Sequence, residues 1–456
     1  MKKNHSKVKA TGYPLLLVFF LTLFLSSCSN NDYVNAIPST VTALVKVDAT
    51  KLDADKVSKV FSALIPVENA AYCGIDWSSN LFAFETIDGN FGLCAKVNSE
   101  SKLADTFDSL VKKGKCSNMR KQGELTFVDV DNAWAVGYSD NTLVVLGPVS
   151  AVALPDAQRR ISRMLRQDVD ASIQSRPMFA KLDSMKSAVS MVAQIQALPE
   201  RFIVPFTIGV PKEADASQIF VAVTFSKDQS VVRMNGEIFS FNKTIDAALK
   251  KSFSSYRKIE GDYLSLIPFD CYLGLFFNVD GKIFLQMLQS NKSMHALLTG
   301  FNMAIDFDNI IRSVDGDLVF VTNGMFSDKT DITMYAKMTH PSWLGDVEYW
   351  KKSCIAGSSI TGTTGAWMYN SGDMHFAFGL MDNIFYGTTN NKQIPTTVHS
   401  KISLITKDVQ NVIKGNRIVM LLNLSSVLSE SALPEKIGCM VNSVLGDVKT
   451  VTYIME

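Results

Sequence analysis

The stretch Ala135-Val136-Gly137-Tyr138-Ser139-Asp140-Asn141 decides which fold we expect, because a close match to it returns 242 residues later. The match is Ala377-Phe378-Gly379-Leu380-Met381-Asp382-Asn383, in which the small residues and the Asp-Asn pair keep identical spacing. A short apolar run followed by Asp-Asn is typical of a strand that enters a tight turn. Self-similarity over such a distance indicates a duplicated unit.

Four further pairs of segments match in the chain. They are Val47-Asp48 with Val279-Asp280, Leu81–Phe84 with Leu318–Val321, Ala95–Val97 with Ala336–Met338, and Ala197–Glu200 with Ala432–Glu435. In sequence order, the five separations are 232, 237, 241, 242 and 235 residues. Two unrelated segments that share common strand and turn residues are the alternative, but five ordered matches favour one segment copied head to tail.

The hydrophobic periodicity of the first copy predicts the order strand, helix, strand, strand, helix, strand. The strands are expected at 42–47, 80–86, 91–97 and 125–130, and the helices at 50–64 and 101–114. This order is the split βαβ arrangement, here followed by a hairpin and another helix. We therefore predict an α+β fold with two tandem copies of a split βαβ-like unit, mostly antiparallel sheets, and helices packed on one face.

The matches also predict the division of the chain into segments. These are a lipoprotein signal peptide at 1–27, a lipidated tether at 28–40, the first copy at 41–217, an intervening hairpin and helix at 218–262, and the second copy at 263–456.

The N-terminus has the pattern of a secretory signal. Four lysines in the first nine residues precede an apolar run from Leu15 to Leu25, which is too short to remain as a membrane-spanning helix. The following Leu25-Ser26-Ser27-Cys28 resembles the bacterial lipobox, which implies cleavage between Ser27 and Cys28 and acylation of Cys28. An ordinary signal peptide with a chance cysteine is the alternative. Two or three acyl chains would anchor the protein stably to a membrane.

The charge balance does not favour nucleic acid as a partner. Of the 45 basic residues, four lie in the first 27 positions, so 41 basic residues remain against 44 acidic ones. A chain with this slight negative excess carries no broad basic surface.

No motif in the sequence predicts a catalytic, metal or cofactor site. His295, His340, His375 and His399 include no pair at helical spacing, and the cysteines other than Cys28 include no closely spaced pair, so we expect at most one disulfide. The closest imitations of catalytic motifs are a glycine pattern at 357–364 without the lysine of a phosphate loop, and Ser-x-x-Lys at Ser109–Lys112 and Ser255–Lys258. We interpret the first as a loop and the other two as solvated helix faces.

Acidic and aromatic clusters also have a structural interpretation. Asp129-Val130-Asp131, Asp306-Phe307-Asp308 and Asp315-Gly316-Asp317 lack the spacing of a calcium loop, and we expect each at a strand turn. The aromatic residues Trp343, Tyr349 and Trp350 could form a sugar-binding platform, but such spacing along a helix favours burial in the core.

The opening of the mature chain, Cys28–Tyr33 through Ile37-Pro38, and then Val47-Asp48 and Leu52, resembles an uncharacterised family of envelope lipoproteins from Bacteroidetes-type bacteria, domain of unknown function 4836. The resemblance implies an outer-membrane lipoprotein and no particular activity. In such bacteria, acidic residues just after the cysteine accompany surface export. Because only Asp32 qualifies here, the periplasmic face is favoured over the cell surface.

The leading hypothesis is a non-enzymatic, lipid-anchored module that binds or supports another envelope component. The alternative is a carrier of an apolar or glycan ligand in a cleft between the two copies. A hydrolase whose catalytic residues converge from distant positions comes third, and no residue is assigned to it. No cofactor is expected.

Overall fold

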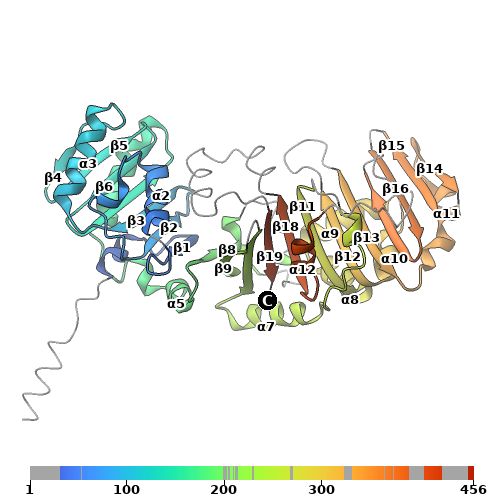
Figure 1. Ribbon diagram of the computed structural model, residues 1–456. Coiled ribbons are helices and arrows are strands. Elements are labelled where there is room, and N and C mark those ends of the chain that lie inside the picture. The colour runs from blue at the N-terminus through green and yellow to red at the C-terminus, as the bar shows by residue number, and fades with distance from the viewer. Residues whose placement is uncertain are drawn as a thin grey trace, which may run out of the picture.

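The computed structural model describes residues 31–455 except 53, 199–202, 204–205, 209, 211–213, 229–230, 268–270, 304, 323–330, 364, 373, 390–404 and 424–449. Within these residues, nineteen strands join in one continuous sheet that gives the molecule an elongated shape (Figure 1). The central strand is β10 (Val231–Phe239), which pairs antiparallel with β9 (Phe220–Asp228) and parallel with β19 (Thr450–Met455).

One half of the sheet extends from β9 in the pairing order β9-β8-β1-β2-β3-β7-β6-β5-β4. These strands are β1 (Ala43–Val47), β2 (Leu81–Glu85), β3 (Phe91–Lys96), β4 (Arg120–Gln122), β5 (Leu125–Val130), β6 (Trp134–Tyr138), β7 (Thr142–Gly147) and β8 (Val189–Gln194).

The other half extends from β19 in the pairing order β19-β18-β11-β12-β13-β17-β16-β15-β14. These strands are β11 (Leu273–Asp280), β12 (Val314–Thr322), β13 (Ile332–Met338), β14 (Ser358–Thr363), β15 (Ala366–Ser371), β16 (Met374–Met381), β17 (Ile384–Thr388) and β18 (Ile418–Asn423). The two halves have the same pairing order, because each strand of the second half takes the place of the first-half strand whose number is ten lower.

The predicted fold class is wrong in two respects. The strands do not form two tandem split βαβ units, because β9 and β10 connect all of them in a single mixed sheet. The helices also cover both faces rather than one. The physical reason is visible in β5, β6 and β7, where every residue is buried, so that each face needs its own cover.

In the first half, α2 (Ala54–Leu64) and α3 (Glu100–Lys112) lie on one face. Their Phe61 and Phe107 pack in one core with Val136. The opposite face is covered by the 3-10 helix η1 (Asp32–Ala36), α4 (Leu154–Met164) and α5 (Pro177–Ser184). Ile161 of α4 shares that second core with Ala135, the neighbour of Val136 in β6. Neighbouring residues of one strand point to opposite faces of the sheet and thus pack in two different cores.

Gly137 explains how closely α4 approaches β6. A Cβ atom at this position would lie 2.5 Å from Cγ2 of Ile161 and 2.9 Å from the Phe127 ring, so a larger residue would push the helix away. Only one of the two matched Asp-Asn pairs forms a tight hairpin turn, since Asp382 and Asn383 have φ values of 48° and 63° in the two-residue turn between β16 and β17, whereas Asp140 and Asn141 do not adopt positive φ. The combination at Asp382 and Asn383 is typical of a type I′ hairpin.

The second half is covered on both faces as well. Its helices are α8 (Gly281–Ser290), α9 (Lys292–Asn302), α10 (Phe307–Arg312), the 3-10 helix η8 (Ser342–Asp346), α11 (Val347–Ser353) and α12 (Lys407–Ile413). Phe277 of β11 packs in one core with Phe284 of α8, whereas its neighbour Phe276 packs in another with Ile413 of α12. Helix α7 (Lys243–Ser254) follows β10 and runs along the lower side of the sheet in Figure 1.

Asp317 holds the loop before β11 to strand β12. Its carboxylate is 1 % exposed and accepts hydrogen bonds from the N–H groups of Glu260, Gly261 and Asp262 at 2.9, 2.6 and 3.3 Å. The Asn278 amide donates to it as well, at 2.9 Å. A buried charge is tolerated when it is fully hydrogen-bonded, and these four donors meet that condition.

We predict that Asp317→Ala lowers the free energy of unfolding by about 3 kcal/mol, because it leaves buried donors without an acceptor. Asp315→Ala is the control, since this neighbouring carboxylate is half exposed and pairs with Arg257 at 2.8 Å. A surface pair of that kind contributes about 1 kcal/mol or less. Urea unfolding measures both values, and equal losses in the two variants would contradict the role of Asp317.

Candidate functional site

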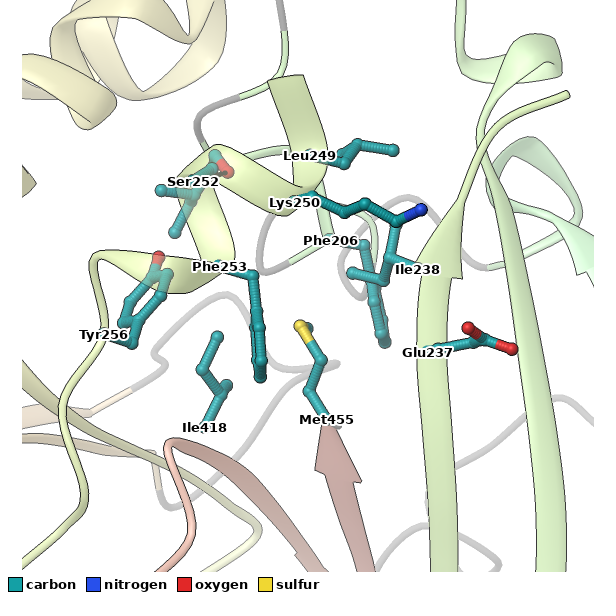
Figure 2. A pocket seen from close by; sticks show the side chains of 11 residues that line it. Phe206, Glu237, Ile238, Leu249, Lys250, Ser252, Phe253, Tyr256, Ile418 and Met455 are labelled. Carbon is teal, nitrogen blue, oxygen red and sulfur yellow. Dashed lines mark hydrogen bonds between the residues drawn. The ribbon is translucent and has the colours of Figure 1, made fainter. Parts of the chain in front are cut away.

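An apolar pocket lies beneath helix α7, next to the junction of β10 with β19 (Figure 2). Its volume is about 130 Å³. The lining side chains come from the segment before β9, from β10, from α7 and the turn after it, and from β18 and β19. They are Phe206, Ile208, Glu237, Ile238, Leu249, Lys250, Ser252, Phe253, Tyr256, Ile418 and Met455. We call this site the junction pocket.

Helix α7 is fixed at its start and along its inner face. The Asn242 side chain caps it by accepting hydrogen bonds from the N–H groups of Thr244 and Ile245, at 3.0 and 3.4 Å. Ile245 and Leu249, four residues apart, are buried against the sheet. This packing sets the position of Phe253 one turn further along.

The floor of the pocket comes from the far end of the chain. Ile418 begins β18 and Met455 ends β19, and the two residues are direct partners in the antiparallel ladder. Figure 2 shows the side chains of Ile418, Met455 and Phe253 pointing toward one another. Phe206 also borders this space and packs edge-on against Tyr453, with ring centroids 5.3 Å apart. Four segments distant in sequence therefore line one mainly apolar pocket.

Charged residues stand at the rim in ion pairs. Lys250 Nζ lies 2.8 Å from an Asp246 carboxylate oxygen, and this hydrogen bond and charge hold the pKa of Lys250 above its ordinary value. Glu237 pairs with Lys181. Because each rim charge already has an opposite charge, the site offers mainly apolar contact to a ligand.

The remaining wall is uncharged and held in place. Burial raises the pKa of Tyr256, so its hydroxyl keeps its proton at neutral pH. Arg417 donates from Nη1 to the Tyr256 carbonyl, and its guanidinium lies 5.7 Å from the centroid of the Phe253 ring. Ser252 Oγ donates a hydrogen bond to the Ile208 carbonyl at 3.2 Å, so the serine hydroxyl is already paired within the protein.

The volume of the junction pocket limits what can enter it. An apolar cavity of about 150 Å³ stays dry and takes benzene or xenon, whereas sites for whole drug-sized ligands measure about 300–1,000 Å³. At about 130 Å³, the junction pocket has room for one group of roughly benzene size.

The segments that resemble catalytic motifs lie outside the junction pocket. Ser109 and Lys112 are on α3, and Ser255 follows the end of α7. The interpretation of the glycine pattern as a loop was wrong, because residues 358–363 form strand β14, which pairs with β15. His295 is on α9 and His375 is on β16, where its Nδ1 lies 2.6 Å from Asn370 Oδ1. His399 and Cys439 fall outside the described residues. None of these residues lines the junction pocket.

The expectation that each acidic cluster lies at a strand turn was wrong in part. Asp129 and Asp317 lie within strands β5 and β12, not in turns, and Asp306 caps helix α10. Asp129 accepts a hydrogen bond from the Gln158 amide at 2.6 Å. Among the residues that the structure describes, no three His, Cys, Asp or Glu side chains are grouped to hold a metal ion.

The aromatic cluster is largely core, as the helical spacing predicted. Trp343 is fully buried and Trp350 is 5 % exposed, and their rings are stacked with centroids 6.2 Å apart. Tyr349 points outward and is 70 % exposed. One exposed ring does not make a sugar-binding platform.

Cys28 and Ser27 lie outside the described residues, so lipidation and cleavage there stay predictions. Among the helices that the structure describes, none has both the length and the apolar character needed to cross a membrane. Cys73, Cys94 and Cys354 form no disulfide in the described part of the chain.

Sequence reasoning missed the junction pocket entirely. The one local signal was the spacing of Leu249, Phe253 and Tyr256, which places three large apolar residues on one side of a helix end. Nothing in the sequence indicated that Ile418 and Met455 would close the space below them.

Comparison with known proteins gives one structural similarity and one family. The chain is similar to a solved structure titled "Structure of crystal form IV of TP0453", with 11 % identity over 43 % of this chain and 76 % of that one, and a TM-score of 0.28. No curated protein matches. A family model described as "Domain of unknown function (DUF4836)" matches residues 49–428, and the chain therefore belongs to this uncharacterised family.

Proposed function

We propose that the protein is a binding module anchored to the outer membrane through acylated Cys28, facing the periplasm. Its junction pocket receives a single apolar group, such as an aromatic ring, from another component of the cell envelope. The observation that carries this proposal is a half-open, mainly apolar pocket of about 130 Å³ with paired charges at its rim.

The size of the pocket favours insertion of one group over carriage of a whole molecule. A lipid or an oligosaccharide needs a larger enclosure than the junction pocket offers. One buried ring, surrounded by polar contacts at the rim, is the usual anchor of a protein interface. Lys250 and Glu237 are exposed beside the apolar space, and their ion pairs with Asp246 and Lys181 form such a polar rim.

The proposed anchor is close to the folded part of the chain. Helix η1 begins at Asp32, four residues after Cys28, a span of at most about 14 Å. Acyl chains stabilise membrane attachment by about 0.8 kcal/mol per buried methylene group, so two or three of them suffice without a membrane-spanning helix. The tether would thus keep the first half of the sheet near the lipid surface.

A prediction about ligand binding concerns the junction pocket. Benzene titrated into protein labelled with ¹³C at the methionine methyl groups is expected to shift the Met455 signal in a saturable way, because Met455 lines the pocket. Ser252→Phe places a ring in the same space and is expected to weaken this binding at least about tenfold.

Ser254→Phe is the matched control, since Ser254 is exposed on the same helix and is not part of the lining. Its Met455 signal is expected to respond as in the unaltered protein. An unresponsive Met455, or equal responses in both variants, would contradict the proposed binding site.

A separate prediction concerns the membrane anchor. Cys28→Ala is expected to release the protein from membranes into the soluble fraction and to abolish incorporation of radioactive palmitate, because no other attachment is proposed. Ser29→Ala, one residue away, should leave both unchanged. The anchor assignment is wrong if the Cys28→Ala protein still sediments with membranes after a high-salt wash.

A further inference from the structure

The sheet ends in two edge strands of different character, β4 in the first half and β14 in the second, at opposite ends of the molecule (Figure 1). Strand β4 has three residues, Arg120–Gln122, two of them basic and all of them exposed. Strand β14 has six residues, Ser358–Thr363, with the sequence SSITGT, which includes neither a charge nor a proline. Short length and charge normally protect an edge from pairing with another chain, and β14 lacks both protections.

We propose that β14 is a dimerisation edge, at which the β14 strands of two copies of this chain pair antiparallel about a two-fold axis through Ile360. The sheet then continues from one copy into the other. This inference goes beyond the proposed function and depends on neither the junction pocket nor Cys28. Three observations carry it: the direction of the backbone groups of β14, the match between those that are free, and the uncharged side chains beside them.

Alternate residues of β14 point their backbone groups away from β15. The Ser358 N–H group donates to the Ile355 carbonyl at 3.0 Å. The Gly362 carbonyl accepts a hydrogen bond from Lys351 Nζ at 3.3 Å. Neither of these partners belongs to β15, so Ser358, Ile360 and Gly362 face outward while the residues between them bond to β15.

The outward groups that are still free match one another across a two-fold axis. They are the N–H and carbonyl groups of Ile360, the Ser358 carbonyl and the Gly362 N–H group, none of which bonds to another described residue. In an antiparallel pair centred on Ile360, this residue faces its own copy and Ser358 faces Gly362. Each chain then donates from Ile360 N–H to the Ile360 carbonyl, and from Gly362 N–H to the Ser358 carbonyl, of the other copy.

The groups that are already occupied fix the register. The Ser358 N–H group and the Gly362 carbonyl stand opposite each other in this pairing, and each is satisfied within its own chain. A shift of two residues in one direction would set the free Ile360 N–H against the occupied Gly362 carbonyl. The opposite shift would set the free Ile360 carbonyl against the occupied Ser358 N–H group. The centred register therefore uses every free group of the edge.

The side chains beside the edge are also compatible with a second copy. Ser359 and Thr361 are exposed and face each other across the axis, so that small hydroxyl-bearing side chains meet without like charges. Ile355, just before the strand, is 51 % exposed and adds apolar area at each end of the interface. The same pairing at β4 would bring Lys121 of two copies together, and their repulsion disfavours it.

Amide hydrogen exchange tests the pairing on the full mature chain with Cys28→Ser, which carries no acyl group. Sedimentation first defines the concentrations at which this chain is monomer and dimer. The Ile360 and Gly362 amides are expected to exchange at least about tenfold more slowly in the dimer, because only the second copy protects them. Thr361 is the internal control, since its N–H group bonds to β15 in both states. A chain that stays monomeric, or equal exchange of Ile360 in both states, overturns the proposal.

Two double variants test the register. Ser359→Lys with Thr361→Lys sets lysine against lysine across the axis and is expected to weaken dimerisation at least about tenfold. Ser359→Lys with Thr361→Glu, at the same two positions, sets opposite charges against each other and is expected to keep the dimer at least as stable as in the unaltered chain. Both positions are exposed, so neither change disturbs the core. Equal dimer dissociation constants for the two variants, measured by sedimentation equilibrium, would also contradict the proposal.

Discussion

The whole architecture depends on one strand, β10, that hydrogen-bonds on both sides. It pairs antiparallel with β9 over Val231–Phe239 and parallel with β19 over Val231–Gly236. Thr452, buried in β19, donates from its hydroxyl to the Val232 carbonyl at 3.2 Å across this joint. Without the parallel pairing, the sheet would be divided into two separate sheets and β19 would be an edge strand. Met455 would then not reach the space beneath α7.

The joint explains why the apolar space occurs where it does. The two halves of the sheet meet at β10. Helix α7 crosses this junction, and the side chains beneath it leave the junction pocket unfilled. Phe253 and Tyr256 come from the end of the helix, whereas Ile418 and Met455 come from the final strands of the chain. The charges of Lys250 and Glu237 lie outside this space, because both side chains are exposed and each pairs with an opposite charge, Asp246 or Lys181. A small apolar space with a polar rim follows from this geometry.

Local features were predictable from the sequence because local physics governs them. The Asp-Asn pair at 382–383 forms the expected turn, and Trp343 enters the core as its helical spacing indicated. Three features required the structure. The pairing of β10 with β19 joins residues about 220 positions apart, and apolar alternation does not reveal a strand's neighbour. The helices on the second face follow from strands buried on both sides, and Asp317 resembled a turn residue until its donors were visible.

Amide hydrogen exchange along β10 tests the central joint most directly. In a strand paired on both sides, every N–H group is hydrogen-bonded, whereas an edge strand leaves alternate N–H groups exposed to water. The amides from Val231 to Gly236 are therefore expected to exchange uniformly slowly, at rates close to those of the interior strand β7. Fast exchange at every second residue of this segment would show that β19 does not pair with β10, and both the continuous sheet and the junction pocket would have to be abandoned.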